Sequence, residues 1–224
     1  MKYIRTFNES TNTSEIEAIC EKYNITNYTI NEDGSIDVDG NVDLYDKKLK
    51  VLPLKFRNVS GNFLCGCNYL TSLEGSPQSV GGNFNYAINQ LTSLVGCPQS
   101  VGGDFNCNYN RLTTLDGGPK RVGKCFSCRD NKLKSIDYLP KYYKELFILN
   151  NPITKIIKLF TTSDGYKNIS NREDKDLIMD FIDREIIQQD KLLVNRLVEF
   201  LDDIGKPKPR EELIELLKND YKIR

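Results

Sequence analysis

The sequence predicts an α/β fold: a solenoid with one short parallel β-strand in each 21-residue turn, capped at both ends. Three observations predict it. The middle of the chain repeats with a fixed period, and apolar and polar residues alternate within each repeat. After residue 155 the spacing of apolar residues changes from about 2 to about 3.6, the change from strand to helix. We therefore expect three parts, residues 1–45, 46–155 and 156–224.

The repeat is visible as columns of identical residues spaced 21 apart. The columns are Leu49, Leu70, Leu91, Leu112 and Leu133; Val59, Val80, Val101 and Val122; Phe63, Phe84, Phe105 and Phe126; and Pro77, Pro98, Pro119 and Pro140. The last turn, from Leu133 to Ile153, is one residue shorter. A fixed period of about 20 to 30 residues is typical of solenoids, in which each turn buries its apolar face against its neighbours.

Within each turn the segment "FNCNYNRL", residues 105–112, carries the strand. Phe105 and Cys107 alternate as on a strand with one buried face. Asn110 belongs to a further column, with Asn68, Asn89, Asn131 and Asn151. Buried asparagine amides need partners, and stacked turns supply backbone groups for them. The glycines that follow the column valines, as a pair after Val80 and Val101, predict a tight bend leading into the strand.

An open solenoid needs a cap at each end. For residues 14–45 we expect a short helix with Ser14 as its N-cap and Glu17 three residues on. A β-hairpin about an Asp33-Gly34 turn follows, because "YTINEDGSIDV" alternates around it.

The C-terminal part, residues 156–224, predicts three amphipathic helices. Ser170 and Glu173 form a capping box for the first of them. The second helix ends at Gly205, and Pro209 opens the third. We expect these helices to cover the last turn as a cap or bundle; a separate interaction module is the alternative.

Composition excludes several classes of function. The chain has 31 basic and 31 acidic residues, so its overall charge indicates neither a nucleic-acid nor a membrane partner. No apolar run approaches the roughly 18 to 20 residues of a spanning helix. The absence of histidine excludes His-based catalysis and His–metal sites. Seven cysteines without an export signal predict reduced thiols in a cytoplasm.

The segment "GGPKRVGKC" is spaced nearly as a phosphate-binding loop. Gly118, Gly123 and Lys124 match that loop, but Cys125 stands where Ser or Thr should bind the metal. Phe126 begins a repeat strand where a helix should follow. We therefore assign the glycines to the repeat and expect no nucleotide cofactor.

Residues 35–46, "SIDVDGNVDLYD", resemble a calcium loop. Asp37, Asp39, Gly40 and Asp43 are acceptably spaced. However, the first ligand would be Ser35, and the last would be Asp46 where such a loop has a bidentate Glu. Strand alternation explains the acidic residues, so no calcium is expected.

Several cysteines of the repeat suggest zinc or disulfides. Cys65, Cys107 and Cys128 occupy the inward strand position that Tyr86 fills in another turn, which favours small core residues. Cys107 and Cys128 would lie roughly 5 Å apart on adjacent turns, close enough to oxidise in air. We expect no metal.

The repeat "LTSLxGxPxxVGGxFxCxxNxL" resembles the short bacterial-type leucine-rich repeat, whose hallmark is LxLxxNxL, with Phe and Cys here in the strand positions. The resemblance covers about residues 42 to 153, and the Gly-Gly pair replaces a leucine of that class. The sequence of the repeat also looks similar to that of repeat proteins from tailed phages. The resemblance implies a leucine-rich-repeat-like solenoid whose strands form a concave protein-binding sheet.

We therefore expect a non-enzymatic scaffold that binds a partner protein, encoded by a phage and acting on a host or phage protein. We expect no cofactor, no small-molecule substrate, and no nucleic-acid or membrane partner. Alternation places the binding residues on the outward side of the strands: Asp43, Tyr45, Leu64, Asn85, Asn106, Asn108, Ser127, Arg129, Phe147 and Leu149, with Asn83 and Asp104 beside them. We expect Arg129, Phe147 and Leu149 to be the anchor. Alternatively, Phe147 and Leu149 only pack under the terminal helices.

Two other classes are weighed against the scaffold. The start "MKYIRTFNES" looks similar to capsid-targeting leaders of tailed phages, and cleavage after Glu9 would suit a virion structural or packaged protein. An enzyme is the third class. Bacterial effectors with similar repeats carry a ubiquitin-ligase cysteine after the repeats, but no cysteine follows Cys128 and no nucleophile–base pair is recognisable.

Overall fold

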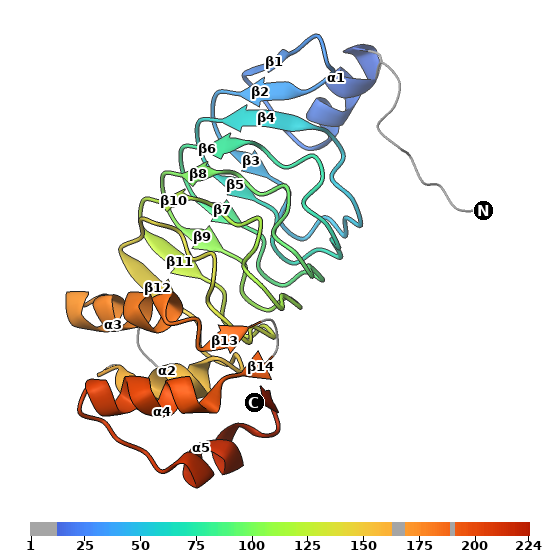
Figure 1. Ribbon diagram of the computed structural model, residues 1–224. Helices are drawn as coiled ribbons and strands as arrows, with labels where there is room; N and C mark the ends of the chain where they lie inside the picture. The colour runs from blue at the N-terminus through green and yellow to red at the C-terminus, as the bar shows by residue number, and fades with distance from the viewer. Residues whose placement is uncertain (1–12, 163–168, 189–190) are drawn as a thin grey trace.

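The computed structural model describes residues 13–162, 169–188 and 191–224, and its central part is a β-solenoid (Figure 1). The solenoid strands are β1 (Tyr28–Ile30), β2 (Ile36–Val38), β3 (Val42–Asp43), β4 (Phe56–Val59), β5 (Phe63–Leu64), β6 (Ser79–Val80), β7 (Phe84–Asn85), β8 (Ser100–Val101), β9 (Phe105–Asn106), β10 (Arg121–Val122), β11 (Cys125–Ser127) and β12 (Glu145–Phe147). Helix α1 (Thr13–Lys22) precedes them. Helices α2 (Thr154–Phe160), α3 (Arg172–Asp183), α4 (Val194–Asp203) and α5 (Arg210–Leu217) follow, with the short strands β13 (Ile187–Gln188), β14 (Lys191–Leu192) and β15 (Lys222–Ile223).

The strands form two sheets that run along the stack. One sheet has the order β1-β2-β4-β6-β8-β10 and the other has β12-β11-β9-β7-β5-β3. Pairing between neighbouring turns is parallel, with Val80 opposite Val101 in the first sheet and Phe84 opposite Phe105 in the second. The predicted solenoid of parallel strands is therefore confirmed, and each turn adds a second short strand at the valine column.

The core is built from the columns that the repeat predicts. The phenylalanines of the second sheet stack from turn to turn, with ring centroids 5.3 Å apart for Phe84 and Phe105 and 5.1 Å apart for Phe105 and Phe126. Cys65, Cys107 and Cys128 are buried beside them, and Tyr86 fills the same inward position. The Tyr86 hydroxyl hydrogen-bonds the Ser76 hydroxyl at 2.7 Å, which satisfies the polar end of the largest of these side chains.

The bend between the two strands of a turn requires glycine because successive bends touch. A Cβ on Gly102 would lie 2.1 Å from the Gly81 carbonyl oxygen, and one on Gly123 would lie 2.0 Å from the Gly102 oxygen. Beside the glycines, Asn83 accepts a hydrogen bond from the Asp104 amide at 2.8 Å. Asp104 in turn accepts one from the Cys125 amide at 3.0 Å. These two side chains therefore join adjacent bends.

The asparagine column is buried and fully engaged, as predicted. The Asn110 side chain accepts a hydrogen bond from the Leu91 amide at 2.9 Å and donates to the Tyr86 and Cys107 carbonyls at 3.0 and 3.2 Å. The same pattern recurs along the stack at Asn68, Asn89, Asn131 and Asn151. The ladder replaces direct backbone pairing where the chain turns away from the sheet.

The N-terminal end is closed by α1 and the predicted hairpin of β1 and β2, which pair antiparallel around Gly34 (Figure 1). Helix α1 buries Ile16 and Cys20. Ser14 lies inside α1, not at its N-cap as expected, because the helix already includes Thr13. The suggested leader and its cleavage point after Glu9 lie outside the described residues.

The C-terminal end differs from the prediction in three details. Asn171, not Ser170, caps α3: its side chain accepts a hydrogen bond from the Asp174 amide at 2.7 Å. The short helix α2 and the small sheet β13-β14-β15 were not anticipated. These elements have only two to seven residues each, so the spacing of their apolar residues gives no clear period in the sequence.

The C-terminal elements pack on the end of the solenoid. The Tyr221 hydroxyl donates to the Lys134 carbonyl at 2.8 Å, and the Lys206 ammonium donates to the Phe160 carbonyl at 2.6 Å. Phe160 packs against Phe181 and Phe200, with ring centroids 5.3 and 5.1 Å apart. None of the helices in the described part of the chain has the length and hydrophobicity that crossing a membrane requires.

Candidate binding surfaces

The residues predicted to bind a partner lie in two rows on the outer side of the sheet from β3 to β12, which we call the polar face. The strand register aligns the first row, in the order Asp43, Leu64, Asn85, Asn106, Ser127 and Phe147. The second row follows two residues later in the chain, at Tyr45, Asn108, Arg129 and Leu149. All ten are exposed or half-buried.

The amides of the polar face are oriented by their own backbone. Asn85 accepts a hydrogen bond from the Ala87 amide at 2.9 Å, and Asn106 accepts one from the Asn108 amide at 3.0 Å. Asn108 accepts from the Ser127 hydroxyl and the Arg129 amide, both at 2.7 Å. Because the side-chain oxygens are engaged, the face presents fixed amide groups rather than mobile ones.

The predicted anchor residues meet at the C-terminal end of the polar face. Ser127 pairs with Phe147, and the Asp130 amide donates to the Leu149 carbonyl at 2.9 Å, so Arg129 and Leu149 lie side by side on neighbouring turns, just after β11 and β12. The Arg129 Nε–H is buried and has no acceptor among the described residues. Phe147 and Leu149 are half-buried, so each keeps part of its side chain at the surface.

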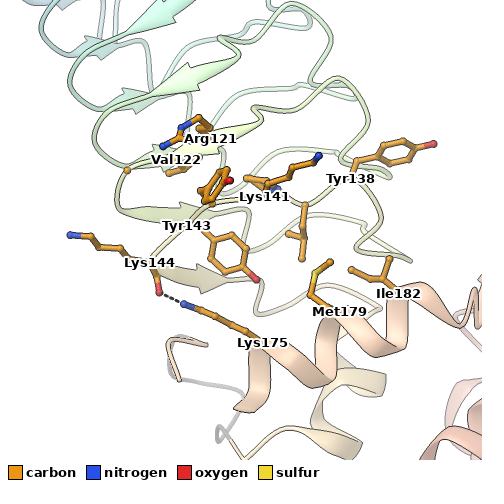
Figure 2. Close-up of a pocket in the computed structure, with 13 residues that line it drawn as sticks. Arg121, Val122, Tyr138, Lys141, Tyr143, Lys144, Lys175, Met179 and Ile182 are labelled. Atoms are coloured by element: carbon orange, nitrogen blue, oxygen red, sulfur yellow. Dashed lines mark hydrogen bonds between the residues drawn. The ribbon is translucent and has the colours of Figure 1, made fainter. Parts of the chain in front are cut away.

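A second surface was not found from the sequence. A groove of about 690 Å³ lies between the end of the β1–β10 sheet and α3 (Figure 2). Its walls are Arg121 and Val122 of β10, the segment 138–144, and Lys175, Met179 and Ile182 of α3. In Figure 2 the side chains of Met179 and Ile182 rise from α3 toward Tyr143. We call this space the α3 groove.

Cations and tyrosines are paired inside the α3 groove. The Arg121 guanidinium lies 4.3 Å from the centroid of the Tyr142 ring, and the Lys175 ammonium lies 5.2 Å from that of Tyr143. Lys175 also donates to the Lys144 carbonyl at 2.7 Å (Figure 2). Burial raises the pKa of Tyr143, so its hydroxyl stays neutral at ordinary pH. The signal for this site is the sequence "PKYYK", which replaces "PQSVGG" of the regular repeats.

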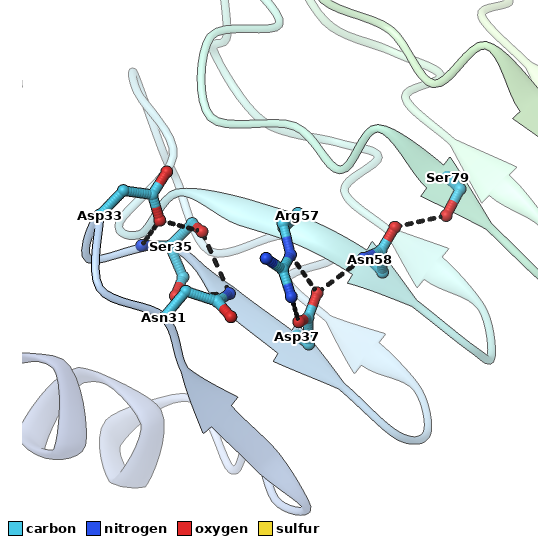
Figure 3. A network of polar contacts seen from close by, with 7 residues as sticks. All are labelled: Asn31, Asp33, Ser35, Asp37, Arg57, Asn58 and Ser79. Carbon is cyan, nitrogen blue, oxygen red and sulfur yellow. Dashed lines mark hydrogen bonds and ion pairs between the residues drawn. The ribbon is translucent and has the colours of Figure 1, made fainter.

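The acidic residues of the calcium-like segment are used within the protein. Arg57 binds Asp37 through two nitrogens, and Asn58 donates to Asp37 at 2.8 Å (Figure 3). The hydrogen bonds from Arg57 are the largest influence on the pKa of Asp37, which is lowered. Asp39 accepts a hydrogen bond from the Ser60 hydroxyl at 2.8 Å. These contacts tie the hairpin cap to the first regular turn.

The cysteines are free thiols in the structure. Burial raises the pKa of Cys65 to about 12 and that of Cys97 to about 12, and it also raises the pKa values of Cys107 and Cys128. Thiolates are the reactive form, so these side chains are chemically quiet core residues. In the described ranges, no group of three or more His, Cys, Asp or Glu side chains is arranged to hold a metal ion. The P-loop-like segment contains β10 and runs into β11, where a phosphate-binding loop would lead into a helix.

Comparison with known proteins gives no match to the chain, whether it is made with family models, with curated proteins or with solved structures.

Proposed function

We propose that the protein is a non-enzymatic scaffold that acts in the cytoplasm and binds another protein through the polar face. We propose further that its turns belong to the short leucine-rich-repeat class, for which the support is the recurring spacing of Phe, Cys, Asn and Leu in segments such as "FNCNYNRL". The observation that supports the proposal is the register of the first row, which runs from β3 to β12 over six neighbouring strands.

A continuous row of this kind suits a protein partner. Parallel pairing brings each outward side chain next to its counterparts on the neighbouring strands, so the rows offer a continuous surface and not an enclosed pocket. The hydrogen-bonded amides are already ordered, which lowers the entropy lost on binding. An aromatic, an aliphatic and an arginine side chain at one end have the composition of a hot spot.

The unsatisfied Arg129 Nε–H strengthens the choice of anchor. A buried donor without a partner costs about 1–3 kcal/mol, and a rotation of the Arg129 side chain that brings its Nε–H to an acceptor on a bound protein would recover that free energy. Phe147 and Leu149 flank the position and would exclude water from the new hydrogen bond.

The experiment that tests this function is site-specific photo-crosslinking in lysate of the cell that produces the protein. A photoreactive phenylalanine replaces Asn106 on the polar face, and in a matched control it replaces Thr113, an exposed residue outside both rows. We expect a discrete crosslinked band from position 106 and none from position 113. The band should vanish when Arg129→Glu and Phe147→Ala are added.

An exposed arginine elsewhere provides the charge control. Arg111→Glu reverses a charge outside the polar face and should leave the crosslinked band unchanged. Circular dichroism must show the same fold for every variant. Equal bands from the two positions, or a band that survives the double substitution, would contradict the scaffold function at this face.

A further inference from the structure

The α3 groove exists because the two sheets end at different turns. The β3–β12 sheet continues to β12, whereas the β1–β10 sheet ends at β10, where Arg121 makes only an isolated bridge to Tyr142. The bulky segment 140–144 stands where regular turns have a valine and two glycines. Helix α3 lies against this irregular last turn and leaves an open space beside it (Figure 2).

Every charged side chain that lines the groove is a cation: Arg121, Lys141, Lys144 and Lys175. Carboxylates occur on the adjoining side of α3, but Asp180 is 3.1 Å from Arg184, and Asp176 is 3.5 Å from Arg172. These two carboxylates, which are next to Lys175 and Met179 in the chain, are therefore engaged with arginines. The groove has a local positive charge in a chain whose net charge is zero.

The floor of the groove is apolar, which the cations alone do not explain. Val122, Leu139 and Ile182 line it, and Met179 keeps 48% of its surface exposed. Methionine adapts its shape to different apolar side chains, which makes it suitable for a binding surface. Tyr138 and Tyr142 at the edge are 64% and 58% exposed.

We propose that the α3 groove binds an acidic peptide segment of a partner protein, with an apolar side chain of that peptide on the floor between β10 and α3. Charge complementarity supplies the acidic character of the peptide, because its carboxylates would meet Arg121, Lys141 and Lys144. The apolar floor beside these cations is the reason for an apolar side chain in the same peptide. The groove shares no residue with the polar face. Peptide binding in the groove can therefore be tested separately from protein binding at the polar face.

A single-stranded nucleic acid fits the groove less well. Nucleic-acid sites of this type stack bases on open aromatic faces. Arg121 already lies over the ring of Tyr142 and Lys175 over the ring of Tyr143, so two of the tyrosines have a face engaged by a cation. Phosphate groups would also leave the apolar floor without a partner.

The test is a selection of random linear peptides displayed on a carrier and captured by the full-length protein. We expect the enriched peptides to combine several Asp or Glu with one or two large apolar residues. The tightest peptide is then labelled and titrated by fluorescence anisotropy. Its Kd should rise by about tenfold or more for Lys141→Glu with Lys144→Glu, since two favourable charges become repulsive.

Three controls make the result specific to the groove. Lys132→Glu reverses an exposed charge on the same solenoid and should leave the Kd unchanged. Met179→Ser removes the apolar contact without a charge and should weaken binding. Phe147→Ala, on the polar face, should have no effect, and thermal melts must show that each variant folds.

Four outcomes would overturn the proposal. They are a selection that enriches nothing, enriched peptides without an acidic excess, binding that survives the Lys141 and Lys144 reversals, and tighter binding of oligo(dT) than of the selected peptide. The last outcome would identify a nucleic-acid site instead.

Discussion

One residue in each turn has a left-handed backbone, immediately before the ladder asparagine. The φ angles of this column are 55° at Cys67, 58° at Ile88, 55° at Tyr109, 54° at Asp130 and 58° at Asn150. This conformation costs an L-residue roughly 1–2 kcal/mol, least for Asn and Asp and most for a β-branched side chain. Ile88 carries the largest strain of the column, and its side chain is 51% exposed, so packing compensates little.

Replacing Ile88 by Asn, the residue that the chain uses at the equivalent position 150, should stabilise the protein. We expect the free energy of unfolding to rise by about 1 kcal/mol and the Tm by about 2–4 °C. Thermal unfolding followed by circular dichroism measures both. Ile88→Val keeps the β-branch and should bring no gain; an equal rise for both variants would show that strain is not the cause.

At the scale of the element, the asparagine ladder connects successive turns at the bend that follows each strand of the β3–β12 sheet. Asn110 provides the acceptor for the buried Leu91 amide. The Tyr86 carbonyl that it binds also receives a hydrogen bond from Asn89 at 3.2 Å, so that carbonyl has a second donor. The backbone N–H of each column leucine, such as Leu91, has its hydrogen-bond acceptor in the asparagine of the next turn.

Asn110→Ala should lower the free energy of unfolding by about 2–3 kcal/mol, because it leaves the buried Leu91 N–H without an acceptor. Asn106→Ala is the matched control: it removes the same side chain from the polar face, where Asn106 accepts only from the Asn108 amide. We expect it to cost about 1 kcal/mol or less. Urea denaturation measures the free energy of unfolding of both variants. Equal losses would show that a ladder asparagine stabilises the protein no more than an asparagine of the polar face.

At the scale of the whole molecule, each turn of the solenoid is stabilised by the turns on its two sides. The first and last turns lack a neighbouring turn on one side, so a cap must cover their apolar ends. At the C-terminal end, Ile153, Ile156 and Phe160 are buried beneath the helical region. Hydrogen bonds from Tyr221 and Lys206 join this region to residues before it in the chain.

Removal of residues 161–224 should expose this apolar end and cause aggregation, which size-exclusion chromatography detects as loss of the monomer peak. Tyr221→Phe removes only the hydrogen bond to the Lys134 carbonyl and should cost about 1 kcal/mol while the protein remains monomeric. A truncated chain that elutes as a folded monomer would show that the last turn needs no cap.

Much of the architecture was predictable because it repeats. Phe84, Phe105 and Asn110 recur at a fixed spacing, and a contact between neighbouring turns is therefore written several times in the sequence. The second strand of each turn was harder to predict, because it ends at a single valine before the glycine bend. Helix α2 was missed for a similar reason: it is too short for a clear helical period.

The sequence by itself determined the solenoid, its buried columns and the alternation that places Asn106 and Arg129 on one face, since these depend on short-range periodicity. Only the tertiary structure decided which residues meet where the repeat becomes irregular. The α3 groove joins Arg121 and Tyr143 to Met179 across a break in the repeat and a separate helix. Such a contact has no counterpart in another turn, so no repeated pattern announces it.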